Sequence, residues 1–311
     1  KKIILPIVCC LLSTGLWAQQ LPLFSQYMLN DYFQNPAIAG SRPYFDAVSA
    51  NRLQWIGITD APRTYALSLQ GPIKKKNMGV GGYLFSDVTG PTRRLGISAS
   101  YAYHIKLTEK IKISLSVSAG VMQFTVDASK LTLANQSDYV FANGYESKTV
   151  PDFGASFYLY GLPKENGTGN WWLGGYVPQI YPAKLKLFET PTPTGTLATH
   201  FYAIGGYKLF ITDDFSAEPS VLVKFVSPAP VQVDAGTRIL YKNKVWIGVF
   251  LIFLIPISVI AVSALTTLSP AGRTRVALTA DGGGMAQWNP EAPAVFTGSY
   301  SARLDTDSDP N

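Results

Sequence analysis

The sequence predicts an all-β fold: an antiparallel transmembrane β-barrel of the outer-membrane type, with about 12–14 strands, whose last strands the pattern does not define. Three observations support this fold class. Only 15% of the 311 residues are charged although 47% are hydrophobic, whereas soluble domains carry about 25% charged residues. A single apolar run is long enough for a transmembrane helix, which excludes a helical bundle. The other apolar residues alternate with polar ones, as they do where one face of a strand meets lipid and the other a lumen.

Residues 1–18 have the features of a signal peptide. A basic start precedes an apolar stretch from Ile3 to Leu12, and the small residue Ala18 marks the expected cleavage site. The alternative is a buried N-terminal strand. Both cysteines, Cys9 and Cys10, lie in this segment, so the predicted mature chain has no thiol for a disulfide or for cysteine chemistry.

The clearest alternation runs from Ile111 to Thr125. Up to Val121 its odd-numbered positions are apolar, and its even-numbered positions are Lys, Ser or Gly. The stretch from Arg94 to Lys106 repeats the pattern, and the polar link between them predicts a hairpin. Ordinary strands average about 5–6 residues, whereas a strand that crosses a membrane needs about 9–11. These lengths therefore favour a membrane barrel.

The predicted barrel occupies residues 44–248. Short links alternate with the long polar links Leu131–Pro151 and Pro182–Leu197, as in barrels with short turns on one rim and long loops on the other. Asp234 and Arg238 would be costly in lipid and are expected to face the lumen. The other candidate strands are Phe45–Trp55, Thr64–Ile73, Gly79–Val88, Asp152–Tyr160, Trp171–Ile180, Thr199–Ile211, Phe215–Val226, Val231–Tyr241 and Lys244–Phe250.

Residues 19–43 form a segment ahead of the predicted barrel. The stretch from Leu23 to Phe33 favours a short helix that ends before Asn35-Pro36, because the residue before a proline disfavours helix. We expect this segment to plug the lumen or to lie at the periplasmic rim. Two roles stay open: its side chains contact a partner, or they pack inside the barrel and only stabilise it.

Several short motifs stand in a fixed order near the start of the chain. Phe-Ser-Gln-Tyr, Asn-Pro-Ala and Ala-Gly-Ser come first, followed by Arg-x-Gln-Trp and Ala-Pro-Arg. The positions that carry them, which are also the candidates for partner contact, are Phe24, Ser25, Gln26, Tyr27, Asn30, Asn35, Pro36, Gly40, Arg52, Gln54, Trp55 and Pro62. In this order, from Gln20 to Gly248, the chain resembles the PorP/SprF family of Bacteroidetes outer-membrane proteins.

The resemblance implies a barrel that serves type IX protein secretion and, in some members, gliding motility. It also implies the partners: outer-membrane lipid, periplasmic type IX secretion subunits and, in some members, a secreted cargo adhesin. Independently of the resemblance, Arg52, Gln54 and Arg63 are predicted to line the lumen and to pair with acidic residues such as Asp46 or Asp60. Substrate recognition is the alternative role for these three.

The residues that enzymes and metal sites use are sparse. The two histidines, His104 and His200, lie on different candidate strands, without a second ligand or an activated nucleophile at suitable spacing. We therefore expect no enzyme activity, no catalytic residue, no metal site and no cofactor. The net charge of +6 is spread along the chain, and no nucleic-acid partner is expected for an exported protein.

Residues 249–311 depart from this pattern. From Val249 to Leu265 the chain is almost continuously apolar, so alternation is lost. Three hypotheses stay open. The tail is aberrant, through a shifted reading frame or a truncated family member; it is a membrane-anchoring helix kinked at Pro256; or it is an unusual closing hairpin of the barrel.

The predicted function is that of a non-enzymatic component of the type IX secretion and gliding machinery in the bacterial outer membrane. It would act by docking periplasmic subunits or surface cargo. The alternative is a plugged outer-membrane channel for small solutes.

Overall fold

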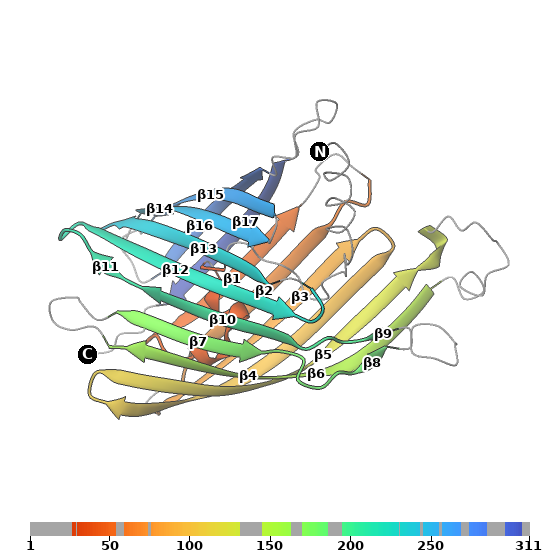
Figure 1. Cartoon of the computed structure of the whole chain (residues 1–311), viewed down its shortest axis with the longest axis horizontal. Coiled ribbons are helices and arrows are strands. Elements are labelled where there is room, and N and C mark those ends of the chain that lie inside the picture. Colours follow the sequence, from red (N-terminus) through yellow and green to blue (C-terminus); the bar gives the residue numbers. More distant parts are fainter. Residues whose placement is uncertain are drawn as a thin grey trace, which may run out of the picture.

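The computed structural model shows one ring of antiparallel strands around a short N-terminal segment (Figure 1). The structure describes residues 27–28, 30–53, 59–73, 76–130, 145–162, 170–185, 195–229, 231–242, 245–254, 257–268, 274–284 and 296–306. The residues predicted as a signal peptide lie outside these ranges.

Fourteen long strands close the ring within the described residues. Each pairs with its neighbour along the chain, β10 pairs with β12, and the last strand pairs with the first. The two-residue strand β11 (Leu209–Phe210) continues β10 and pairs with β12, and β8 (Lys184–Leu185) and β9 (Gly195–Thr196) pair only with each other. The ring strands are β1 (Phe45–Leu53), β2 (Arg63–Pro72), β3 (Met78–Thr89), β4 (Thr92–Thr108), β5 (Ile111–Asp127), β6 (Tyr145–Gly161), β7 (Trp171–Val177), β10 (His200–Tyr207), β12 (Phe215–Val226), β13 (Gln232–Tyr241), β14 (Val245–Leu254), β15 (Ile257–Leu268), β16 (Thr274–Gly284) and β17 (Phe296–Thr306).

The two faces of the wall have opposite polarity. On β5, Leu115 and Val117 are 48% and 64% exposed and point outward, whereas Ser114 and Ser116 are buried and point inward. A soluble barrel would bury the apolar face instead. An apolar outer face and a polar interior are what a strand requires when lipid lies outside and water or a plug lies inside. The fold is an antiparallel transmembrane barrel of the outer-membrane type, as predicted.

All eleven strands predicted between residues 44 and 250 are present, with shifted bounds. The largest shift is in β6, which begins at Tyr145 and runs through Pro151, where the sequence predicted a loop. Proline has no N–H for a strand ladder. Pro151 is tolerated because β7 pairs with β6 only from Ala155 onward, so at Pro151 the ladder lies on the β5 side alone.

The chain after Gly248 continues the barrel. β14 and β15 form a hairpin, and β16 and β17 follow, so that β17 pairs with β1 from Thr306 opposite Phe45 onward. Of the three hypotheses for this tail, the structure agrees with the one in which the tail closes the barrel. Closure gives β1 a paired neighbour on each side, so this strand presents no unpaired edge to lipid. In the described part of the chain, no helix is long and apolar enough to cross a membrane.

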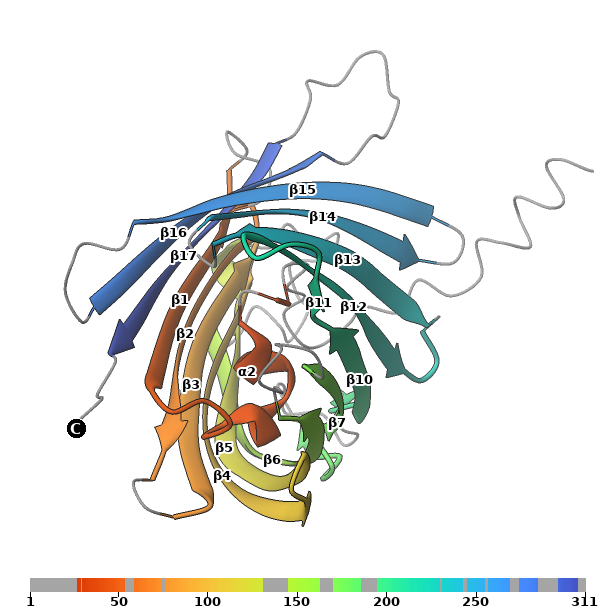
Figure 2. The same cartoon turned by 90° about the vertical axis from the view of Figure 1, so that its left-hand side faces the viewer.

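The two rims of the barrel differ in their links. At one rim β4 passes to β5 and β13 to β14 within a few residues; we call it the short-turn rim (Figure 1, left). At the other rim, the long-loop rim, the links from β5 to β6 and from β7 to β10 are much longer. Figure 2 looks into the barrel from the short-turn rim, with helix α2 (Asp31–Gln34) inside the ring.

Candidate functional site: a plug held inside the lumen

The segment from Tyr27 to Pro43 lies ahead of β1 and forms a plug inside the barrel (Figure 2). Its described core is α2, followed by the 3-10 helix η1 (Pro36–Ile38). Asn30 caps α2, since its side chain accepts a hydrogen bond from the Phe33 N–H. Asn35 ends α2 and caps η1, because its side chain accepts from the Ala37 N–H. The predicted helix from Leu23 is therefore shorter among the described residues, and two asparagines of the sequence motif set its bounds.

Hydrogen bonds tie the plug to strands on opposite sides of the ring. The Tyr27 hydroxyl lies 2.7 Å from the Ser220 hydroxyl on β12, and the Tyr32 hydroxyl lies 2.7 Å from the Ser100 hydroxyl on β4. The Asn35 amide donates to the Phe157 carbonyl oxygen on β6 at 2.9 Å. Four more ties are Ser68 Oγ to Asn30 Oδ1, the Gly40 N–H to Gln70 Oε1, Arg238 Nη1 to the Met28 carbonyl oxygen, and His104 Nε2 with the Ala39 carbonyl oxygen.

These seven ties fix the plug in place. A typical buried hydrogen bond contributes about 1 kcal/mol net, and leaving one partner unsatisfied costs about 1–3 kcal/mol. The plug also buries aromatic side chains: the rings of Phe33 and Tyr83 have centroids 4.6 Å apart within the main apolar cluster. Displacing the plug would break these hydrogen bonds and expose the buried aromatic side chains at the same time.

Glycines let the wall approach the plug backbone. A Cβ atom added to Gly79 on β3 would lie 2.0 Å from the Ala39 carbonyl oxygen, which no side chain allows. Gly40 has a φ of +76°, a conformation that favours glycine. The Gly40 of the sequence motif is therefore needed for the turn that leads out of the plug against β3.

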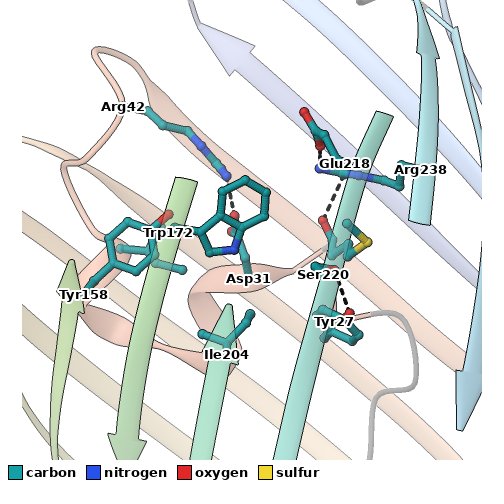
Figure 3. Close-up of a pocket in the computed structure, with 11 residues that line it drawn as sticks. Tyr27, Asp31, Arg42, Tyr158, Trp172, Ile204, Glu218, Ser220 and Arg238 are labelled. Atoms are coloured by element: carbon teal, nitrogen blue, oxygen red, sulfur yellow. Dashed lines mark hydrogen bonds and ion pairs between the residues drawn. The ribbon is translucent and has the colours of Figure 1, made fainter. Parts of the chain in front are cut away.

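A polar cavity of about 140 Å³ lies between the plug and the wall (Figure 3). Its lining residues are Tyr27, Met28, Asp31, Ile38, Arg42, Tyr158, Trp172, Ile204, Glu218, Ser220 and Arg238. Each guanidinium in it has a carboxylate partner. Arg42 pairs with Asp31 and, at 2.7 Å, with Asp46, and Arg238 pairs with Glu218 at 2.5 Å. The charges of this cavity are thus neutralised within the protein and hold the plug.

Burial sets the ionisation of the plug. It raises the pKa of the Tyr27 phenol to about 12 and that of Tyr32 further, so both hydroxyls stay neutral and able to donate. Burial alone would lower the pKa of Arg42, but the surrounding groups, Asp31 first and then Tyr44 and Asp46, together raise it by more. Arg42 therefore stays charged between the plug and β1.

The comparisons identify the family. Residues 16–263 match the family described as type IX secretion system membrane protein PorP/SprF. The chain belongs to this family. The match continues past Gly248, where the resemblance in the sequence was expected to end, and reaches into β15.

Solved structures with a similar fold are outer-membrane proteins. The toluene transporter TbuX of Ralstonia pickettii aligns with a TM-score of 0.52 at 9% identity, over 89% of this chain and 92% of that one. The monoaromatic hydrocarbon channel CymD gives 0.48 at 11% identity, over 93% and 94%, and a FadL homologue of Pseudomonas aeruginosa gives 0.45 at 7%, over 84% and 88%. At such identities the TbuX likeness shows the fold alone. A search of curated proteins found no match. This PorP/SprF protein is therefore a membrane protein with the fold of an outer-membrane barrel.

The structure places the motif residues of this PorP/SprF protein in two regions. Tyr27, Asn30, Asn35 and Pro36 are buried in the plug, in the contacts that the packing alternative expects. Arg52 lies on the inward face near the end of β1, opposite the inward Thr64, and Pro62 is half-buried just before β2. Phe24, Ser25, Gln26, Gln54 and Trp55 lie outside the described residues.

Some of the charged residues predicted to face the lumen do so, and one does not. Asp234 and Arg238 both lie on the inward face, Asp234 fully buried and bonded to Lys224 at 2.7 Å. Arg63 is exposed at the start of β2, on the face of the lipid-facing Tyr65, so its predicted lumen position is wrong. The two expected acidic partners are held by other residues: Asp46 pairs with Arg42, and Asp60 pairs with Lys130.

The sequence patterns did not predict several residues that hold the plug. Arg42, Gln70, Ser100 and His104 had no recognised role there. The available signal was parity: Ser100 and His104 share the inward face of β4, so their side chains had to meet whatever fills the lumen. Within the described residues, no group of three or more histidine, cysteine or acidic residues has the arrangement of a metal site.

Proposed function

We propose that this protein is a non-enzymatic docking component of type IX secretion in the outer membrane, which contacts periplasmic subunits or surface cargo and does not conduct solutes. The plug carries the proposal. It is tied to β2, β4, β6, β12 and β13, on several sides of the lumen. A barrel filled in this way serves as a rigid membrane platform.

Family membership supports the secretion role, and the resemblance adds gliding motility and a Bacteroidetes source as expectations. The polarity of the wall supports the outer membrane, where barrels have short periplasmic turns and longer extracellular loops. By that rule the short-turn rim faces the periplasm. Residues 1–18 would then direct export.

Deletion of residues 20–41 tests the proposal. The variant is expected to assemble, to conduct strongly in planar bilayers and to fail in secretion, whereas the unmodified protein conducts little. Assembly is checked by the shift of the folded band on unheated gels. Co-purification of periplasmic secretion subunits with the unmodified protein is the positive readout. A large steady current through the unmodified protein contradicts the proposal.

The second candidate is a plugged channel for small solutes. The cavity of about 140 Å³ beside the plug favours it, since that volume holds several water molecules between the plug and the wall. TbuX, with a similar fold, is described as a toluene transporter. A steady current in the unmodified protein, with secretion unaffected by plug deletion, would select this function.

A further inference from the structure

Four lysines lie at one corner of the short-turn rim, which we call the basic corner: Lys76, Lys106, Lys110 and Lys112. They come from two neighbouring hairpins, β2–β3 and β4–β5. The His104 N–H donates to the Asn77 carbonyl oxygen at 2.8 Å and joins the two hairpins at this point. Figure 2 shows the β4–β5 hairpin at the mouth of the barrel, below the plug.

Two lysines of the basic corner oppose each other directly. Lys106 on β4 is the register partner of Lys112 on β5. Like charges directly opposite on an antiparallel pair are destabilising. The described residues supply little compensation, because the ion pair they offer is Lys106 with Glu109, at 3.9 Å, and that carboxylate side chain is 92% exposed.

The two opposed lysines stand on the inner face of the wall. Lys106 has the strand parity of the buried Ala102 and His104, and Lys112 that of the buried Ser114. Their ammonium groups therefore lie at the mouth of the lumen and not among lipid headgroups. Beneath them, the Tyr160 hydroxyl lies 3.1 Å from His104 Nδ1, and Tyr160 is the register partner of Lys112. A hydrogen-bonded polar pair therefore lies directly beneath the basic corner.

The other side of the same mouth is neutralised. Lys208 pairs with Glu218 at 3.3 Å, and Lys242 pairs with Asp214 at 3.6 Å. Among the side chains that the structure describes at this rim, the lysines with a weak carboxylate partner or none are therefore those of the β2–β5 side. A patch of one sign on one side of a mouth sets the orientation of a partner as well as attracting it.

We propose that the basic corner docks a carboxylate-rich segment of a periplasmic protein at the mouth of the plugged barrel. This rests on the proposed docking function and on the periplasmic position of the short-turn rim. The acidic segment supplies the counter-charge that the fold lacks between Lys106 and Lys112. Protein carboxylates fit the site better than lipid phosphates because the opposed lysines face the lumen.

A binding measurement with the full-length protein in nanodiscs tests the site. The probe is a fluorescent deca-glutamate peptide, followed by anisotropy at low and at physiological salt. Reversal of the opposed pair, K106E with K112E, is expected to weaken binding at least about tenfold, and salt is expected to weaken binding to the unmodified protein. The matched control is K130E with K148E, which changes the charge equally at the long-loop rim. It should leave binding within about twofold.

Equal losses in both double variants would mean a net-charge effect and would overturn the site, as would no loss in either. Discs of phosphatidylglycerol and of phosphatidylcholine distinguish the source of the anion. Phosphatidylglycerol discs repel the peptide in any case, so the readout is the ratio of affinities between the unmodified protein and K106E with K112E. A ratio that is large in phosphatidylcholine discs and near one in phosphatidylglycerol discs assigns the corner to lipid phosphate and overturns the protein partner. A stability readout is independent of the probe: Lys112→Gln should leave the barrel as stable or more so, because it relieves the opposed charges. A structural role for Lys112 would give a loss.

Secretion assays separate this inference from the function on which it rests. If plug deletion blocks type IX export and K106E with K112E does so while assembling normally, both stand. If plug deletion blocks export and the reversal does not, the proposed function stands and the basic corner fails. If neither variant affects export, the proposed function itself fails.

Discussion

Lys224 and Asp234 form the most deeply buried ion pair among the described residues. Both side chains are at most 5% exposed, and the Gln232 amide donates a second hydrogen bond to Asp234 at 2.7 Å. A buried pair adds little net stability, but removing one partner leaves a charge uncompensated. The pair joins β12 to β13 on the inward face of the wall, where the packed interior shields both charges from water.

Removal of one partner is therefore expected to be costly. Lys224→Met should destabilise the barrel by about 3–5 kcal/mol, and the double variant K224M/D234L should recover most of that loss. Urea titration of the folded band on unheated gels measures both.

The matched control is Lys130→Met, because the Lys130–Asp60 pair at the rim is nearly half exposed on both sides. We expect little change there. Equal losses at Lys224 and Lys130 would show that burial of the pair does not determine its importance.

The sequence could predict the faces of Asp234 and Arg238, although not that of Arg63, and it could not predict their partners. Asp234 and Arg238 share one parity, and the cost of charge in lipid sets their direction. The partners depend on strand register and on the plug. The Tyr27–Ser220 contact joins residues 193 apart in the chain, and no local pattern specifies it.

At the scale of elements, the plug depends on close backbone approach as much as on hydrogen bonds. Gly79 lets β3 touch Ala39, and the seven ties then place the polar groups of the plug. Loosening this one contact should release the plug without removing any hydrogen-bonding group.

Gly79→Ala is expected to raise the rate at which the plug is labelled at least about tenfold, because the added Cβ has no room beside Ala39 and would displace the plug. The reporter is a Met28→Cys background, in which maleimide labelling measures access to a side chain that is 7% exposed. Gly195→Ala is the control, since nothing lies within 4 Å of the added Cβ there. Unchanged labelling in Gly79→Ala would show that this contact does not hold the plug.

Strands were more predictable than their ends. Alternation located every ring strand up to β14, since a strand with one face toward water and one toward lipid has a period of two. The short strands β8 and β9 lie within a predicted loop. The bounds failed where a proline lies on a locally unpaired side, as at Pro151. After Gly248 the sequence from Val249 to Leu265 is apolar at nearly every position, so period two could not be read there, although β14 and β15 form.

At the scale of the molecule, stability depends on closure of the ring. β17 pairs with β1 along the whole of β1, from Phe45 to Leu53. Without it, β1 would present unpaired N–H and C=O groups to lipid, each at a cost of several kcal/mol.

Truncation after Gly248 is accordingly expected to abolish assembly. The variant loses most of β14 and all of β15, β16 and β17, and with β17 the partner of β1 on one side. Truncation after Thr306, just past β17, should behave as the full chain. Protease resistance in membranes and the folded band on unheated gels report the result. A protease-resistant barrel from the shorter chain would show that residues after Gly248 are dispensable for the ring.

The pairing of the first strand with the last also orders events in time. β17 follows all the other described strands in the chain, so its pairing with β1 cannot form until β17 itself has been synthesised and exported. The plug is joined directly to β1 and therefore lies beside the unpaired edge of β1 until β17 arrives. The strands must then close around a plug that already lies inside, because the plug cannot enter through the wall of a closed barrel. A lesion in β16 or β17 would consequently act first on the capture of the plug, which lies ahead of β1 in the sequence.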